Sequence, residues 1–518
     1  MKLLIRGIAI TVMIVLAFLP SSVLAKKIFK AAYTTNPPTL DAILSSTTAT
    51  RQIAINLFES LVVIGEGYEV IPQLAEKWEI SKDGKVYTFT LRSGVKFHNG
   101  KTLTAEDVAA SMNRFKESPL GKKGLSIASS IEAVDARTVR FTLTRNAPLL
   151  GILTIPIPFP AVLPKEIVEK YGQNEVKGAD LIGTGPLKLI EWKPDVAIRL
   201  AKFEDYAVDN RFDGPSGFGG KRVVHFDEIH IIPVTEASAR LAGLETGEFD
   251  FAESLPLNAY NGLLDNPNTV PAIQKPKWGI MMNINKSQFP TSEAKFRRAL
   301  VYAIDKEKVM KAITQGRKEF YRIQNSVYFP EQKDWYIAEG QDEYNKKDVG
   351  KAKKLLQEIG YKGEEVIYIS NRDYDWMYKA SLPLVTEWKN AGINVKLVYY
   401  DWPSGIQRQR DKKDWHIFQT GWSPRMDPTM QLQTFDGSGT SSASHWYKSP
   451  EMDKLMDAVN KGAPLAERQA AWKKVQMLYW EEVPFLRVGD YFELEAVRKN
   501  VKGYKTFYVT PRFWGVTK

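Results

Sequence analysis

The side chains that most often carry out catalysis form no recognisable constellation in this sequence. Its five histidines lie far apart, and none stands in a His-Glu-x-x-His pattern, which would place two zinc ligands on one helix face. The chain has no cysteine and no Gly-x-x-x-x-Gly-Lys loop, so it lacks a thiol nucleophile and a phosphate cradle. We therefore expect no catalytic residues, no metal and no cofactor. A carboxylate pair leaves no local signature, so a hydrolase stays open as an alternative.

Binding chemistry is available in three short segments that contain arginine and tryptophan. Arginine presents a planar fork that matches carboxylate or phosphate, and tryptophan offers a flat wall for a ring, a sugar or an aliphatic stem. Alternatively, the tryptophans are core residues and Arg372 pairs with Asp373 or Asp375. The candidate ligand-binding residues in these segments are Asn371, Arg372, Trp402, Trp422, Ser423, Arg425 and Asp427.

Each of the three segments follows a predicted strand. Residues 365–370, 393–400 and 415–421 have the composition of strands, and helices over 376–391 and 403–411 are expected to connect them. This β-α-β-α-β order with short connections predicts a parallel, doubly wound sheet. Ligands bind at the carboxyl ends of the strands in such sheets, so we expect the three segments to meet at one edge.

The rest of the chain has the pattern of a mixed α+β protein. Residues 86–92 and 139–144 alternate apolar and polar side chains, which predicts strands. Thr104 and Asp107 form a capping-box-like start for a helix over 108–115. We also expect a glycine-rich surface loop over 214–220, a strand over 223–232 and a helix over 294–303.

The N-terminus has the order of a secretory signal. Lys2 and Arg6 precede an apolar run that is too short to span a bilayer, and small residues end at Ala25. We expect cleavage after Ala25, although a buried N-terminal helix is the alternative. Lys26 follows the cleavage site where a lipid-anchored protein needs a cysteine, so we expect a free protein in the periplasm.

Length and charge set further limits. A chain of 518 residues is too long for one hydrophobic core, which favours two or three domains. The formal net charge of +11 raises the question of a nucleic-acid partner. Lys and Arg are scattered rather than concentrated in one stripe, so we expect no nucleic-acid binding.

Several motifs together resemble one protein family. They run in that family's order over nearly the whole chain, and they are Trp78 to Gly100, Thr104 to Val108, Gly183-Thr184-Gly185-Pro186, Phe296 to Ala299, Tyr302 to Asp305, Gly421-Trp422 and Val497 to Tyr504. The sequence is identified on these residues as a member of the bacterial extracellular solute-binding proteins of family 5, the peptide, nickel and opine receptors of ABC importers.

The resemblance implies an α/β, two-lobed periplasmic-binding-protein fold of the large, three-subdomain type. Lobe I would comprise residues 26–280 and 487–518, with an α+β subdomain inserted near 60–180, and lobe II residues 281–486. Such a protein closes about a hinge over a small-molecule solute and delivers it to an inner-membrane ABC permease. It makes and breaks no bond, and we expect a monomer.

The resemblance also indicates where the solute binds. In similar peptide receptors, an aspartate shortly after the Gly-Trp pair holds the amino terminus of the peptide, whereas Arg425 stands there in this chain. Asp427 follows two residues later, and Arg372 resembles in position an arginine that holds a carboxylate in dipeptide receptors. We therefore hypothesise an anionic, peptide-like or opine-like solute. The candidates on lobe I and near the hinge are Thr35, Asn36, Thr48, Arg51, Trp278 and Asn283.

Other functions stay open at this point. A general oligopeptide or dipeptide receptor would need Asp427 or another acid to hold an amino group. A nickel-chelate receptor is a further alternative, but no residue pattern selects a metal. An exported hydrolase or a periplasmic chaperone would belong to a different class, separated by turnover or by broad affinity for unfolded chains.

Overall fold

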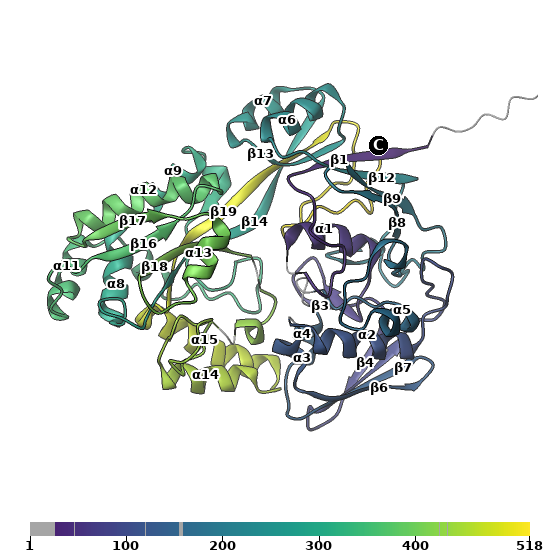
Figure 1. Ribbon diagram of the computed structural model, residues 1–518, viewed down its shortest axis with the longest axis horizontal. Coiled ribbons are helices and arrows are strands. Elements are labelled where there is room, and N and C mark those ends of the chain that lie inside the picture. Colours follow the sequence, from purple (N-terminus) through teal and green to yellow (C-terminus); the bar gives the residue numbers. More distant parts are fainter. Residues whose placement is uncertain (1–25, 46, 120, 155–158, 424, 432–433) are drawn as a thin grey trace, which may run out of the picture.

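The structure is a computed structural model that describes residues 26–518 apart from 46, 120, 155–158, 424 and 432–433. The predicted signal peptide, residues 1–25, lies outside the described residues. Two lobes lie side by side, and the long strands β14 (Thr269–Ile284) and β19 (Phe485–Arg498) join them (Figure 1).

One large mixed sheet runs through both lobes. Its other strands are β1 (Ile28–Tyr33), β8 (Leu187–Lys193), β9 (Ala197–Lys202), β12 (Glu228–Pro233), β13 (Phe251–Leu255), β15 (Tyr321–Arg322), β16 (Val366–Ser370), β17 (Val395–Tyr399) and β18 (Ile417–Trp422). Across the described chain the order is β17-β16-β18-β14-β19-β13-β1-β12-β9-β8, with β15 paired to β19. Because β14 and β19 pair with each other and with strands on either side, they form a continuous backbone connection between the lobes.

Lobe II contains the predicted doubly wound unit. Strand β16 pairs in parallel with β17 and with β18, and helices α12 (Asp375–Asn390) and α13 (Trp402–Arg408) make the crossovers. The β-α-β-α-β prediction is confirmed. The other helices of this lobe are α8 (Ala294–Ala303), α9 (Lys306–Thr314), α10 (Gln341–Asn345), α11 (Val349–Glu358), α14 (Pro450–Asn460) and α15 (Leu465–Glu482).

An antiparallel sheet of four strands forms a separate subdomain of lobe I. Its order is β4-β5-β7-β6, and β5 (Val86–Leu91) and β7 (Thr138–Leu143) confirm two predicted strands. Helix α2 (Ala105–Glu117) begins with the capping box of Thr104 and Asp107, because Thr104 N donates to Asp107 Oδ2 at 2.9 Å. The remaining elements here are β2 (Val62–Ile64), β3 (Val70–Pro72), β4 (Ala75–Ile80), β6 (Ala128–Asp135), α3 (Lys122–Leu125), α4 (Leu149–Leu153) and α5 (Lys165–Tyr171).

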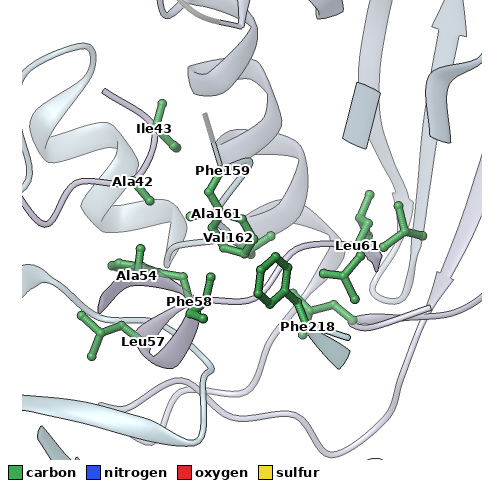
Figure 2. Close-up of a cluster of buried hydrophobic side chains, with 14 of the residues drawn as sticks. Ala42, Ile43, Ala54, Leu57, Phe58, Leu61, Phe159, Ala161, Val162 and Phe218 are labelled. Carbon is green, nitrogen blue, oxygen red and sulfur yellow. The ribbon is translucent and has the colours of Figure 1, made fainter. Parts of the chain in front are cut away.

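The core of lobe I includes a segment that the sequence placed on the surface. Figure 2 shows Phe218 among buried side chains from helix α1 (Thr48–Leu57) and from residues 159–162. Gly217 has a φ of +52°, and a Cβ atom there would lie 2.1 Å from Ile64 O, so only glycine allows this backbone approach. The prediction of a surface loop over 214–220 is wrong for residues 217–220, which are buried because Gly217, Gly219 and Gly220 serve close packing. The strand expected over 223–232 begins only at Glu228.

Helices α6 (Ala237–Thr246) and α7 (Tyr260–Asp265) lie over the junction of the lobes (Figure 1). A third, smaller core cluster is found there and includes Leu244, Phe249 and Phe492. The expected lobe boundaries near residues 281 and 486 lie within β14 and β19, so the junction is built of two strands.

Candidate functional site

A cavity of about 1320 Å³ lies between the two lobes, next to the strands that join them. Lobe I contributes Thr34, Thr35 and the start of α1, and lobe II contributes Trp376, Trp402 and Arg425. The joining strands contribute a further part of the wall, with Lys277, Trp278, Tyr491 and Glu493. Because both lobes form its walls, a solute in this cavity contacts both.

The carboxyl ends of the three parallel strands supply the lobe II wall. Asp373 follows β16, Trp402 follows β17, and Ser423 and Arg425 follow β18, and all four line the cavity. Strand direction alone brings these segments to one edge, as the rule for doubly wound sheets requires. Six of the predicted binding residues line the cavity, namely Thr35, Thr48, Trp278, Trp402, Ser423 and Arg425.

Arg372 is exposed and does not line the cavity. Its guanidinium carbon lies 4.5 Å from the ring centre of Tyr399 and 5.5 Å from that of Tyr378. The alternative of a local ion pair is not seen either, because Asp375 pairs with Lys379 at 2.5 Å and Asp373 accepts from the backbone of Trp402. Arg372 is therefore exposed and stacked on two tyrosines of lobe II in this structure.

Four further predicted residues are used in internal contacts. Asn371 is buried and its Oδ1 accepts from Tyr374 N at 3.1 Å. The Trp422 ring lies 4.7 Å from that of Phe485, in the core of lobe II. The other two are Asn36, which accepts from Trp192 Nε1, and Asn283, which donates to Gln409 Oε1.

Asp427, the acid considered for holding an amino group, forms a buried ion pair. Arg468 Nη1 and Nη2 donate to its two carboxylate oxygens at 2.9 and 2.5 Å. Thr429 N and Oγ1 each donate to Asp427 Oδ1 at 2.9 Å. These four bonds direct the carboxylate to lobe II, and Asp427 does not line the cavity.

Arg425 on lobe II and Arg51 on lobe I lie close enough for their charges to interact. Arg425 is half-buried, and no carboxylate of the described residues forms an ion pair with it. Arg51, on α1, is buried. Burial and, to a smaller extent, the positive charge of Arg425 lower the pKa of its guanidinium to about 10, and Tyr508 opposes this shift. Arg51 is not among the residues that line the cavity, so Arg425 lines it with a second, buried positive charge nearby.

An acidic group of residues at the joining strands was not predicted. Glu253, on β13, accepts from Thr34 N at 2.8 Å and from Gln52 Nε2 at 2.7 Å. Glu493, on β19, lies 2.6 Å from Lys277 Nζ, and both are cavity residues. A usable signal was the presence of charged residues at positions 277, 493 and 495 inside otherwise buried strands.

A model of the bacterial extracellular solute-binding proteins of family 5 matches residues 69–443. The chain belongs to this family. The dipeptide-binding protein of Escherichia coli is 30% identical over 487 residues, which cover 87% of this chain and 86% of that protein. This family 5 protein is therefore a solute-binding protein of an ABC importer, which confirms the prediction from the sequence motifs.

Solved structures confirm the two-lobed fold of this family 5 protein. The periplasmic binding protein DppA of Helicobacter pylori, in complex with the peptide STSA, has a TM-score of 0.77 and 25% identity, covering 95% of this chain and 98% of that one. AgaA of A. tumefaciens R10, in complex with agropinic acid, has a TM-score of 0.77 and 24% identity, covering 93% and 96%. The family consists of transport binding proteins. No helix among the described residues is long and apolar enough to cross a membrane.

Proposed function

We propose that this family 5 protein captures an anionic, peptide-like or opine-like solute in the periplasm and delivers it to an inner-membrane ABC permease. One observation supports the charge of the solute: Arg425 lines the cavity, and no carboxylate of the described chain forms an ion pair with it. A buried or half-buried guanidinium gains most from an acidic partner that it can hold with two hydrogen bonds. The solute is therefore expected to supply that partner.

The size and the second pole of the cavity support a solute larger than a simple anion. A volume of about 1320 Å³ exceeds the 300–1,000 Å³ that is common for small-ligand pockets. Glu253 and Glu493 also line the cavity, and their charge is opposite to that of Arg425. A peptide or an opine carries both amino and carboxylate groups, so each can be placed near an opposite charge.

A general dipeptide or oligopeptide receptor is the second candidate. The peptide-binding relatives support it, and so does the acidic pole of the cavity. In that case Glu253 or Glu493 would hold the amino terminus, because both line the cavity and Asp427, which pairs with Arg468, does not. The two candidates differ in whether the solute must carry acidic groups beyond one carboxyl terminus.

The cellular setting is also part of the proposal. We propose cleavage after Ala25, which leaves Lys26 at the new N-terminus where a lipid anchor would need a cysteine. We also propose that the protein is a monomer. The chain is proposed to make and break no bond of its solute, since the work of the family is capture and release. Closure is coupled to binding because a solute that contacts both lobes favours the closed arrangement.

The test is native mass spectrometry of the protein purified from the periplasm without refolding. The expected spectrum shows the chain from Lys26 onward together with a bound species of peptide or opine size that carries at least two acidic groups. The Arg425→Ala variant is expected to lose this species. A wild-type protein that carries no solute and binds none of a panel of opines, acidic peptides and neutral peptides would overturn the proposal.

A further inference from the structure

We infer that Arg51 of lobe I and Arg425 of lobe II together hold one anionic group of the solute, so that this group bridges the two lobes. The inference rests on the proposed function for the class of solute. It adds which residues bind the negative charge of the solute and how binding favours closure of the lobes. The group is a carboxylate or a phosphate, since both fit the guanidinium fork.

Arg51 is positioned as a donor whose outer nitrogens point to no protein acceptor. Its Nε donates to Thr510 Oγ1 at 2.9 Å, and its guanidinium carbon lies 5.3 Å from the ring centre of Tyr508. Nη1 and Nη2 are buried and have no hydrogen-bond partner among the described residues. Buried guanidinium nitrogens are rarely left in this state, because each unsatisfied donor costs free energy.

The cavity runs along the start of α1, next to Arg51, which is not itself one of its lining residues. Thr48, three residues before Arg51 on α1, and Gln52, the residue after it, both line the cavity. Arg425 lines it from the other lobe. The guanidinium carbon of Arg51 lies 5.3 Å from the centre of the Tyr508 ring, and the charge of Arg425 also opposes the rise in the Tyr508 pKa that burial causes, so both charges lie near this side chain.

The lobes already meet beside these two arginines. The Ser423 side chain is hydrogen-bonded to Tyr508, and Met426 belongs to the core cluster of lobe I although it follows a lobe II strand. Closure therefore brings Arg425 toward Arg51 and forces two like charges into a poorly solvated place. An anion between them turns this repulsion into attraction, so it binds the closed arrangement better than the open one.

The experiment measures thermal unfolding of the protein from Lys26 onward in sodium chloride, sodium malonate and sodium phosphate at equal ionic strength. The variants are Arg51→Gln, Arg425→Gln and the double variant. The matched controls are Arg145→Gln on lobe I and Arg410→Gln on lobe II, which remove the same charge from exposed positions. Malonate and phosphate distinguish a carboxylate site from a phosphate site.

We expect malonate or phosphate to raise the wild-type unfolding temperature above its value in chloride, and the controls to behave in the same way. Either single variant should lose this extra rise, and the double variant should lose no more than a single one. Arg51→Lys, which keeps the charge but not the fork, should keep part of it. The solute eluted from wild-type protein should bind Arg51→Gln at least about tenfold more weakly.

An Arg51→Gln protein with the wild-type anion response and solute affinity would overturn the inference while leaving the proposed function intact. A wild-type protein that carries and binds no solute would instead contradict the proposed function. In that case the anion response of Arg51→Gln against Arg145→Gln still decides the inference, because it needs no solute.

Discussion

Replacing Asp427 by asparagine tests whether this acid supports lobe II or holds the solute. The carboxylate accepts two bonds from Arg468, at 2.9 and 2.5 Å, and both side chains are buried, with exposed fractions of 9% and 7%. Asparagine keeps the volume and an acceptor for Thr429 but leaves the charge of Arg468 buried without its partner. Breaking a buried pair from one side costs about 3–5 kcal/mol.

Thermal and guanidinium-induced unfolding of the solute-free protein measure this cost. For a unit of the size of lobe II, the expected fall in the unfolding temperature is on the order of 10 °C. The matched control is Asp414→Asn, since Asp414 pairs with Arg408 at 2.8 Å but is 66% exposed. That exposed pair contributes less than about 1 kcal/mol, so the control should unfold close to wild type.

The opposite result would refute the reasoning. If Asp427→Asn unfolded like wild type but lost affinity for peptides with a free amino terminus and not for acetylated ones, Asp427 would be a ligand-binding group. A double variant, Asp427→Leu with Arg468→Met, gives a second check. It should recover part of the lost stability, because an apolar pair leaves no charge buried alone.

Two further predictions concern the joining strands and the core of lobe I. Burial raises the pKa of Glu495 from 4.5 to about 8, so between these values the unfolded chain releases a proton that the folded chain retains. The free energy of unfolding therefore falls as the pH rises from 5 to 8. The denaturant midpoint of Glu495→Gln should exceed that of wild type by more at pH 8 than at pH 5. An equal difference at the two pH values would contradict this. Gly217→Ala should cost more than about 2 kcal/mol, since its Cβ would meet Ile64 O. Gly178→Ala is the matched control, because Gly178 has a similar φ but open space around it. Equal losses of unfolding free energy in urea for the two variants would argue against the contact with Ile64 O.

Local sequence signals predicted the helices and the doubly wound unit well. Helix α8 has the predicted bounds, Ala294–Ala303, because its apolar period and the residues that end it all lie within a dozen positions. The segment 214–220 shows the limit of such signals. Glycine marks a backbone that side chains would obstruct, but the sequence does not say whether solvent or another strand approaches it.

The two walls of the cavity differed in how far they could be predicted. The lobe II wall follows from strand direction, so Trp402 and Arg425 were found from the sequence. Glu253, Lys277 and Glu493 come from three strands that meet only in the folded sheet, and no spacing along the chain links them. The position of Arg372 was not predictable for a related reason. The sequence shows that it follows a strand, whereas its stacking on Tyr399 depends on a neighbouring strand.

The central claim is that the protein carries an anionic solute between its lobes and that Arg425 holds it. The most direct measurement is the native mass of the periplasmic protein, taken in parallel for wild type, Arg425→Ala and the exposed control Arg410→Gln. We predict one bound acidic species on wild type and on the control, and its loss from Arg425→Ala. Retention of the same species, in the same proportion, on Arg425→Ala would contradict the claim.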